Sequence, residues 1–283
     1  FGKNMSAGVI NVISASPSFN PSAEFVGSYG NYNAWTVSGA ATGGLIGDTV
    51  AGRIFALKRE RDGFWKVRTG AGPRTSTRAA NENNWTVRAQ LLIRPTDRVD
   101  IRLIGDWSER DEDCCVNAPS IAGPTAAFVD ALAPDAGTLR NGKPFDRITY
   151  ANRPTDFRIR DRGVSGQLDW ELSDALSLTS ITAYRYYKSN SGVDIDYSSA
   201  DIWYRGSDGN SNQFKVFSQE ARLAYNSERI NSILGVFYAD ERLEARQNTF
   251  FGSDYERYFG LLLSGGTNPN AVSALTGIAA GSN

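Results

Sequence analysis

Carboxylate side chains are the first candidates for chemistry in this sequence, because they gather in two places. The two groups are Asp106 with Glu109 and the run Asp111-Glu112-Asp113, and Asp194 with Asp196 and Asp201. Several carboxylate oxygens held close together can bind a hard cation such as Ca²⁺. Runs of this kind are also typical of solvated loops, and we favour that interpretation for both groups. No carboxylate pair stands out as the acid and base of a glycoside hydrolase.

Two absences narrow the chemistry further. The sequence contains no histidine, which excludes Ser-His-Asp and Cys-His nucleophilic triads and histidine-ligated metal sites within the chain. Its only cysteines are the neighbours Cys114 and Cys115, so it has no CxxC metal or redox motif. We therefore predict no enzyme activity, no catalytic residue, no metal site and no cofactor.

The composition limits the class of protein. The 283 residues carry 30 lysines and arginines against 31 aspartates and glutamates, a net charge of −1, which gives no general attraction to nucleic acid. No run of 18 apolar residues exists, so a transmembrane helix is excluded. A membrane span by β-strands stays open, because alternating strands average to a polar hydropathy. The chain begins FGKNMSAG, without a signal peptide, and we interpret it as a fragment.

Alternation with a period of two residues is the dominant pattern along the chain. It places Val87 and Leu91 on one side of a strand and Arg88 and Gln90 on the other. We predict eight strands on this basis, at residues 24–43, 49–67, 84–95, 98–109, 157–172, 175–194, 214–225 and 230–250. All of them exceed the usual five or six residues of a soluble strand.

Short and long connections alternate strictly between these predicted strands. The short turns are residues 44–48, 96–97, 173–174 and 226–229, and the long loops are residues 68–83, 110–156 and 195–213. In an antiparallel meander, alternate connections lie at opposite ends. All short turns therefore fall on one side, as in a transmembrane barrel with tight periplasmic turns and long external loops. Two short helices are expected in loops, at residues 124–134 and 268–280.

The first residues carry a recognisable motif. The run FGKNMSAGVINVI at residues 1–13 resembles the end of the plug domain of TonB-dependent outer-membrane receptors. Further stretches are similar to barrel strands of the same family, at residues 27–32, 51–64, 217–223 and 234–238. The plug-motif residues are Gly2, Asn4, Gly8, Val9, Ile10, Asn11 and Ile13.

The resemblance implies an all-β fold. It divides the chain into the end of a plug domain (residues 1–16), a linker (17–23) and the N-terminal part of the receptor β-barrel (24–283). The barrel would be an antiparallel, up-and-down transmembrane barrel, here about eight of the family's 22 strands. The family's energy-coupling TonB box and most of its plug have no counterpart in the sequence.

The resemblance also implies a function and partners. The family binds a scarce, bulky ligand, most often an iron–siderophore complex, and takes it up across the outer membrane of Gram-negative bacteria. The expected partners are outer-membrane lipid, a TonB-type coupling protein and a small-molecule metal chelate, with no nucleic acid, and the complete receptor is expected to be a monomer. Polar strand residues would face the lumen and contact the plug or an anionic ligand, namely Arg53, Arg88, Arg102, Glu220 and Arg222.

The cysteine pair lies in the predicted loop after the fourth strand. Outside the inner membrane the milieu favours oxidation, so a vicinal disulfide between Cys114 and Cys115 is expected to have a structural role in this loop. Pairing to cysteines outside the given sequence and two free thiols are the alternatives.

Two other functions fit parts of the pattern. A passive outer-membrane β-barrel channel would have the same strands and no coupling box. A soluble β-rich carbohydrate-binding protein or hydrolase would bury its apolar strand faces in a closed core and dissolve without detergent.

Overall fold

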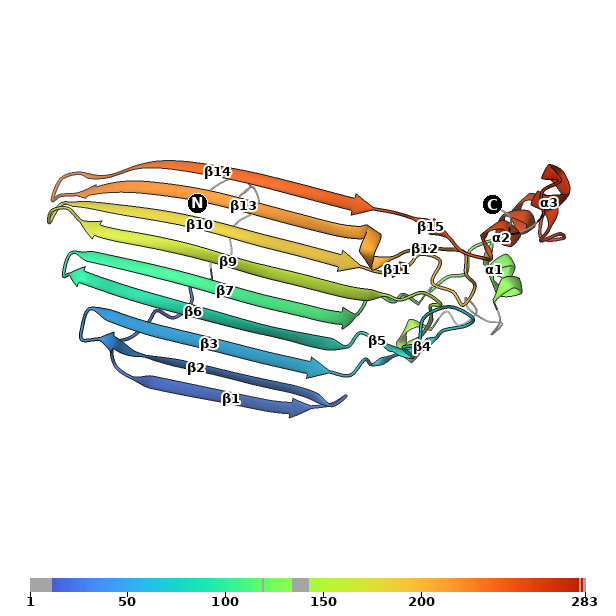
Figure 1. Cartoon of the computed structure of the whole chain (residues 1–283), viewed down its shortest axis with the longest axis horizontal. Helices are drawn as coiled ribbons and strands as arrows, with labels where there is room; N and C mark the ends of the chain where they lie inside the picture. The colour runs from blue at the N-terminus through green and yellow to red at the C-terminus, as the bar shows by residue number, and fades with distance from the viewer. Residues whose placement is uncertain (1–11, 119, 134–142, 280, 282–283) are drawn as a thin grey trace.

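A single large antiparallel sheet dominates the computed structural model, which describes residues 12–118, 120–133, 143–279 and 281. Its nine strands follow one another across the sheet in sequence order, each hydrogen-bonded to the next (Figure 1). They are β1 (Ser22–Gly30), β2 (Ala34–Ile46), β3 (Val50–Arg61), β6 (Glu82–Thr96), β7 (Val99–Asp113), β9 (Asp156–Glu171), β10 (Leu176–Ser191), β13 (Asn210–Asn226) and β14 (Asn231–Gln247). The predicted all-β, up-and-down antiparallel architecture is confirmed.

The sheet is open. Strands β1 and β14 form its two edges, and among the described residues neither edge pairs with the other. The architecture is therefore that of a section of barrel wall, as predicted, and not of a small closed barrel.

The prediction of eight strands was wrong by one. Residues 24–43, predicted as a single strand, form β1 and β2, which pair with each other in register from Ser22 opposite Thr42 to Gly30 opposite Ala34. Tyr32 and Asn33 adopt φ of 62° and 53° in the turn between them. Two successive left-handed residues suit a tight hairpin, and asparagine tolerates this conformation well. The turn signal was present in the sequence, but the apolar residues on both sides concealed it.

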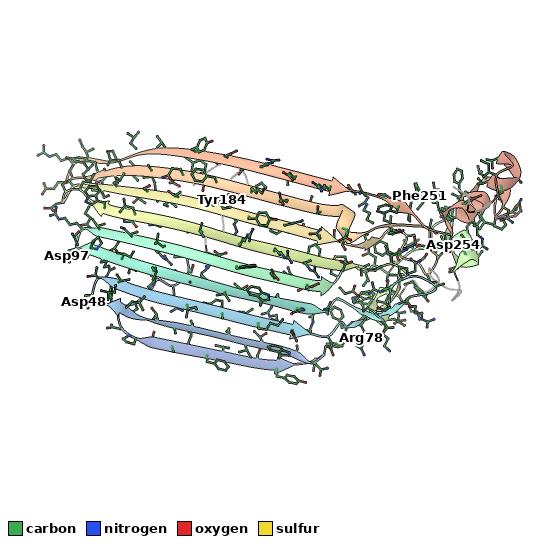
Figure 2. All side chains as sticks on the ribbon, in the orientation of Figure 1. Asp48, Arg78, Asp97, Tyr184, Phe251 and Asp254 are labelled. Atoms are coloured by element: carbon green, nitrogen blue, oxygen red, sulfur yellow. A yellow bond between two sulfur atoms is a disulfide. The ribbon has the colours of Figure 1, made fainter. Side chains whose placement is uncertain are left out.

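Connections differ in length at the two ends of the sheet. The four predicted short turns, which join β2 to β3, β6 to β7, β9 to β10 and β13 to β14, lie at one end together (Figure 1). Figure 2 labels Asp48 and Asp97 at this end, with Arg78, Phe251 and Asp254 at the other. The long connections and the tight β1–β2 turn share that second end.

The two faces of the sheet are unequally exposed. On β6, Gln90 and Leu92 are buried, whereas Val87 and Leu91 are exposed. Burial on the first side comes from residues 12–20, which lie across it. We term the side with Arg88, Gln90 and Leu92 the covered face, and the side with Val87 and Leu91 the open face.

The long loops pack into a compact unit, here termed the loop cluster. It contains two small sheets, of β4 (Trp65–Arg68), β5 (Arg78–Ala79) and β8 (Ile148–Tyr150), and of β11 (Val193–Asp194), β12 (Trp203–Arg205) and β15 (Phe250–Phe251). Its helices are α1 (Ala126–Leu132), α2 (Tyr255–Leu263) and α3 (Ala271–Thr276), with 3₁₀ turns at Pro144–Asp146 and Ser207–Gly209.

One apolar core joins three loops within the loop cluster. Val129 and Leu132 from α1 pack with Ala200, Ile202 and Leu261, the last from α2. Helices α1 and α3 fall inside the stretches expected to be helical, whereas α2 was not predicted. Within the described residues, no helix combines the length and apolarity needed to cross a membrane.

Close backbone approach inside the loop cluster gives a test of its packing. A Cβ at Gly72 would collide with the backbone oxygen of Asn152, whereas one at Gly123 would meet nothing within 4 Å. We expect Gly72→Ala to destabilise the loop cluster by about 1–3 kcal/mol, because overpacking forces the backbone apart. Limited proteolysis should show faster cleavage of the long loops in this variant. Gly123→Ala should match the wild type, and equal cleavage of both variants would contradict the packing.

Candidate functional site

A row of polar side chains crosses the covered face of the sheet. Strand pairing sets Arg53 of β3 opposite Gln90 of β6, and Arg88 of β6 opposite Asp106 of β7. Because side chains alternate along each strand, these residues share one face. The local sequence pattern thus places them together.

Residues 12–20 lie along this row and are bound to it. Arg88 Nη1 donates to Ser14 Oγ over 2.8 Å, and Arg102 Nη2 donates to the Ser14 carbonyl oxygen over 3.1 Å. Gln90 Nε2 donates to the Ala15 carbonyl oxygen over 3.2 Å. Arg102 also donates to Gln90 Oε1 over 2.6 Å, which orients the amide. Two arginines and one glutamine therefore hold this segment against the sheet.

The arginines of the covered face are compensated by carboxylates. Asp106 lies 3.5 Å from Arg88 and 3.1 Å from Arg185, which also contacts Asp161 at 2.8 Å. Charge-assisted hydrogen bonds of this kind are stronger than neutral ones. The covered face thus carries a connected ionic network that fixes the directions of its guanidinium groups.

All five residues predicted to face a lumen lie on the covered face, but the structure separates them into two groups. Arg88 and Arg102 contact residues 12–20, and Arg53 lies beside them and pairs with Glu24 at 3.4 Å. Glu220 and Arg222 lie on β13 and pair with each other at 3.0 Å.

Most of the predicted plug motif lies outside the described residues: Gly2, Asn4, Gly8, Val9, Ile10 and Asn11. Ile13 is described, and its side chain is 79% exposed.

The first acidic group proves to be a set of ion pairs. Arg74, buried in the loop cluster, donates to Asp113 Oδ2 over 2.6 Å and to Thr155 Oγ1 over 2.9 Å. Thr155 Oγ1 in turn donates to Asp113 Oδ1 over 2.5 Å. This network joins the loop after β3 to the ends of β7 and β9.

The remaining members of that group also face arginines. The pairs are Asp111 with Arg158 (2.7 Å), Glu112 with Arg110 (3.0 Å) and Glu109 with Arg160 (3.4 Å). Over the part of the chain that the structure describes, no three acidic or cysteine side chains are placed to hold a metal ion. The carboxylates here position loops and strand ends.

Asp201, from the second acidic group, joins two long loops. The Arg153 guanidinium donates two hydrogen bonds of 2.8 and 2.6 Å to the Asp201 carboxylate, and it lies 3.8 Å from the centroid of the Tyr204 ring. Ser253 N also donates to Asp201 Oδ2 over 2.9 Å. Burial opposes the charge on Asp201, but the hydrogen bonds from Arg153 and Ser253 outweigh it and lower its pKa to about 2.

Asp194 is fully buried and accepts backbone hydrogen bonds from two loops. Its Oδ2 accepts from the amides of Asn152 and Arg153 over 2.7 and 3.1 Å, and its Oδ1 accepts from Tyr197 N over 3.1 Å. Burial raises the pKa of Asp194 to about 8, and the neighbouring Asp196 carboxylate adds to the shift. Asn152 and Arg153 are distant in sequence from Asp194, so no local signal could have identified these two partners.

Cys114 and Cys115 form a disulfide, with an S–S distance of 2.09 Å. Cys114 N donates to the Thr155 carbonyl oxygen over 3.0 Å, directly beside the Asp113–Arg74 pair. The disulfide therefore lies where the end of β7 enters the loop cluster.

Comparison with solved structures decides the class of this sheet. The ferric yersiniabactin uptake receptor FyuA from Yersinia pestis matches with a TM-score of 0.66 and 13% identity, over 86% of this chain and 34% of the receptor. The siderophore receptor PiuA from Acinetobacter baumannii matches at 0.57 and 12%, over 84% and 34%. The pyoverdine outer membrane receptor FpvA from Pseudomonas aeruginosa PAO1 matches at 0.55 and 11%, over 84% and 32%. The chain has the fold of part of the barrel in these solved receptors.

The receptor-barrel fold agrees with the resemblance drawn from the sequence motifs. The chain spans about a third of the length of the solved receptors that it matches. No protein-family model matches it. These solved structures are of receptors, and at 11–13% identity the match establishes the fold alone.

The raised pKa of Asp194 predicts that the loop cluster loosens as pH rises. Its folded pKa of about 8 lies above the usual value near 4. Between about pH 4 and pH 8 the Asp194 carboxyl is therefore protonated in the folded state and ionised in the unfolded state. Stability is then greatest at low pH and falls as pH rises toward 8. Hydrogen exchange at the Asn152 and Arg153 amides, corrected for its intrinsic pH dependence, should show protection decreasing from pH 6 to 9.

Two variants separate Asp194 from its neighbours in this experiment. Asp194→Asn should reduce the pH dependence, because it removes one of two titrating groups and leaves Asp196, whose pKa is also raised by burial. Asp201→Asn should weaken protection but keep the wild-type slope, because Asp201 stays ionised throughout this range. An unchanged slope in Asp194→Asn would contradict the assignment.

Proposed function

We propose that this chain is part of an outer-membrane receptor for the energised uptake of an iron–siderophore complex. The observation that carries the proposal is the binding of residues 12–20 across the polar face of a sheet with the receptor-barrel fold. A barrel whose lumen is occupied by an internal segment needs polar contacts that hold the segment and can also release it. Hydrogen bonds from Arg88 and Arg102 meet this requirement, because water can replace them.

In this proposal residues 1–16 end a plug domain, 17–23 form a linker and 24–283 form barrel wall and loops. The covered face becomes the lumen. Arg53, Arg88 and Arg102 line it where the plug joins the wall, and Glu220 and Arg222 lie farther round the wall. The loop cluster lies outside the cell, where a metal chelate enters, and a TonB-type protein acts from the side of the short turns.

The open face has the dimensions of a lipid-facing surface. On β7 it runs from Val99 through Leu103 to Trp107, eight residue steps that span roughly 27 Å. The apolar band of a transmembrane barrel is about 25 Å tall and flanked by aromatic residues. Trp85 and Trp107, with ring centroids 5.9 Å apart, lie at one limit of this band, and Trp170 lies opposite Val99 at the other.

The open face also carries polar side chains, including Asp240 opposite Phe217, and one group of them is satisfied within the sheet. Gln219 accepts a hydrogen bond from Thr182 Oγ1 and donates to Ser180 Oγ over 3.0 Å. Polar side chains bonded to each other in this way can face hydrocarbon at low cost, because they leave few unpaired groups.

The uptake proposal is tested in cells that produce the whole protein under iron limitation. Radiolabelled iron is supplied on catecholate and on hydroxamate siderophores, with and without a protonophore. We expect uptake of iron with one of these carriers that stops when the proton gradient is abolished. Uptake that continues without the gradient would favour the passive channel, and a protein that is soluble without detergent would favour the soluble carbohydrate-binding alternative.

The assignment of the two faces is tested by adding a charge to each. Leu91→Arg on the open face should cost about 2–4 kcal/mol if that residue lies near the bilayer midplane. Ile181→Arg should cost much less, because Ile181 lies on the covered face opposite Gln167 and Glu220. Urea unfolding of the whole protein in lipid bilayers measures both changes. Equal losses would show that neither face meets lipid.

A further inference from the structure

The disulfide between Cys114 and Cys115 lies between two points at which the chain after β7 is anchored. The first anchor is Asp113, the last residue of β7, whose carbonyl oxygen accepts from Ala80 N over 2.7 Å. Cys114 N adds a hydrogen bond of 3.0 Å to the Thr155 carbonyl oxygen. The backbone is therefore held in place up to the first cysteine.

The second anchor begins directly after the pair. Val116 packs against a small apolar core, here termed the β4–β8 core, whose buried members are Val67, Ala79 and Ala151. The Asn117 carbonyl oxygen accepts a hydrogen bond from the buried Thr149 hydroxyl of β8. The β4–β8 core joins the long loop after β3 to the long loop after β7. The two cysteines alone thus separate an anchor on the sheet from an anchor on these loops.

The backbone between the two anchors has an uncommon conformation. Cys115 adopts φ of 66°, in the left-handed region that residues with a Cβ atom disfavour. The disulfide closes a small ring through both side chains and the peptide bond between them. It therefore restricts this stretch even when the anchors are released, as a cross-link restricts an unfolded chain. Without the bond, Cys115 regains the ordinary conformations, and these turn the following residues away from the β4–β8 core.

The two cysteines differ in exposure. Cys115 is exposed, whereas Cys114 is half-buried. A thiolate attacks a disulfide sulfur that it can reach, which makes Cys115 Sγ the point of attack. The sequence contains no third cysteine, so exchange within these 283 residues cannot move the bond elsewhere. The attacking thiol must come from another molecule.

We propose that Cys114–Cys115 is a thiol-exchange site, and that its reduction by a small thiol detaches Val116 and Asn117 from the β4–β8 core. The site connects the redox state of the surrounding medium to the packing of two long loops. This inference goes beyond the proposed function and does not depend on it, because it concerns only how these loops are held together.

The exchange is balanced in two steps. The thiolate of a low-molecular-weight thiol attacks Cys115 Sγ, the S–S bond breaks, and Cys114 leaves as a thiolate that takes the proton lost by the external thiol. A second external thiolate then attacks the external sulfur of the mixed disulfide, and Cys115 leaves as a thiolate that is protonated in the same way. The protein disulfide gains two electrons, and two external thiols are oxidised to one disulfide.

Hydrogen exchange of the whole protein, before and after treatment with a millimolar excess of reduced glutathione, measures the detachment. The reporters are the amides of Cys114 and Ala151, which donate to the carbonyl oxygens of Thr155 and Arg68. We expect exchange at both amides to be roughly 5–30-fold faster after reduction, the range that one left-handed residue with a Cβ atom implies. Alkylation of the new thiols, read as a mass increase, confirms the reduction, and reoxidation should restore slow exchange.

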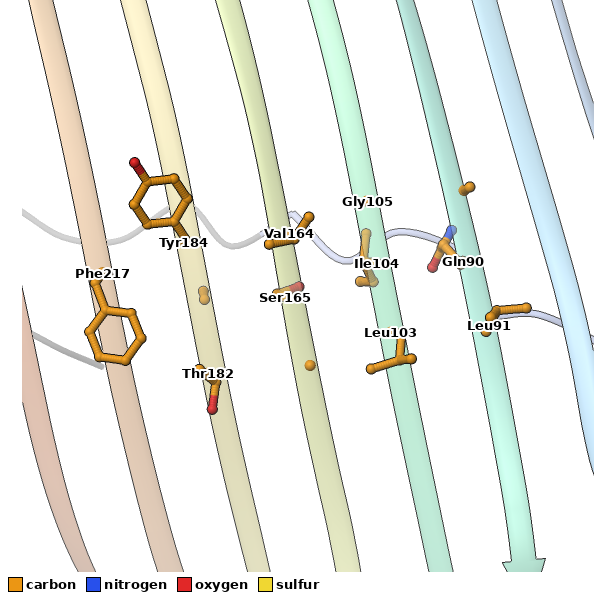
Figure 3. A pocket seen from close by; sticks show the side chains of 13 residues that line it. Gln90, Leu91, Leu103, Ile104, Gly105, Val164, Ser165, Thr182, Tyr184 and Phe217 are labelled. Atoms are coloured by element: carbon orange, nitrogen blue, oxygen red, sulfur yellow. The ribbon is translucent and has the colours of Figure 1, made fainter.

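The sheet provides an internal control for this experiment. Figure 3 shows Leu91, Leu103 and Val164 on three neighbouring strands, and the residues at these positions take part in the pairing of β6, β7 and β9. Their exchange should not change on reduction. Faster exchange there would show that the whole fold loosens, which would contradict a local effect of the disulfide.

Two double variants separate the backbone conformation from the loss of sulfur. Cys114→Ser, Cys115→Ser removes the bond and keeps a side chain at the second position, so it should exchange as the reduced wild type does. Cys114→Ser, Cys115→Gly also removes the bond, but glycine adopts positive φ at no steric cost, so this variant should stay close to the oxidised wild type. Neither variant should respond to glutathione.

Three results would overturn the proposal. They are unchanged exchange at Cys114 and Ala151 after reduction, a disulfide that the glutathione leaves intact, and equal exchange in the serine and glycine variants. None of these results bears on the proposed function, which the uptake of iron tests separately.

Discussion

Backbone pairing between consecutive strands is the constraint on which the rest of the structure depends. Each of the nine long strands hydrogen-bonds to its neighbours in sequence over most of its length, and the pairing register fixes which side chains share a face. A slip of one residue in the pairing of β6 would place Val87 and Leu91 on the covered face and Arg88 and Gln90 on the open face. The ionic network of the covered face and the apolar band of the open face both follow from this single register.

Arginine is the residue that joins the separate parts of the molecule. On the covered face Arg88 and Arg102 connect the wall to residues 12–20, and in the loop cluster Arg74 and Arg153 connect loops that are far apart in sequence. The planar, multiply donating guanidinium suits this task, because it can bond a carboxylate and a carbonyl or hydroxyl oxygen at once. The two places differ in the burial of the arginines. Arg74 is buried, so removing its partner would be costly, whereas 34% of the Arg88 side chain on the covered face is exposed.

Local sequence patterns predicted the sheet well, because strand alternation and turn residues are both features of short stretches of sequence. The alternation in β6 and the short turns between hairpin strands were sufficient for the strand positions and for the separation of turns from loops. The turn at Tyr32 and Asn33 was missed because it lies inside a stretch that reads as continuous strand. Helix α2 and the pairing of Lys66 with Ile148 depend on contacts between loops, and no pattern in either loop specifies them.

The candidate site residues also divide into features set by local sequence and features set by contacts between distant segments. Strand periodicity was enough to assign Arg53, Arg88, Arg102, Glu220 and Arg222 to one face, but it could not tell which of them would meet residues 12–20. That choice depends on the path of the chain before β1, where Ser18 N donates to Thr42 Oγ1 over 2.8 Å and directs the segment toward β6. For the acidic groups, the sequence showed the carboxylates but not their partner Arg74, which contacts Asp113 at the end of β7 and Thr155 just before β9.

The edges of the sheet set the conditions under which this wall can exist in a membrane. Every residue of β1 is exposed, and so is nearly every residue of β14, and each edge presents unpaired N–H and C=O groups along its length. Water can satisfy these groups, but hydrocarbon cannot, at a cost of several kcal/mol for each one. A sheet placed in a bilayer as proposed therefore needs further strands beyond both β1 and β14. The open face and the covered face acquire their separate roles only when those strands close the wall around residues 12–20.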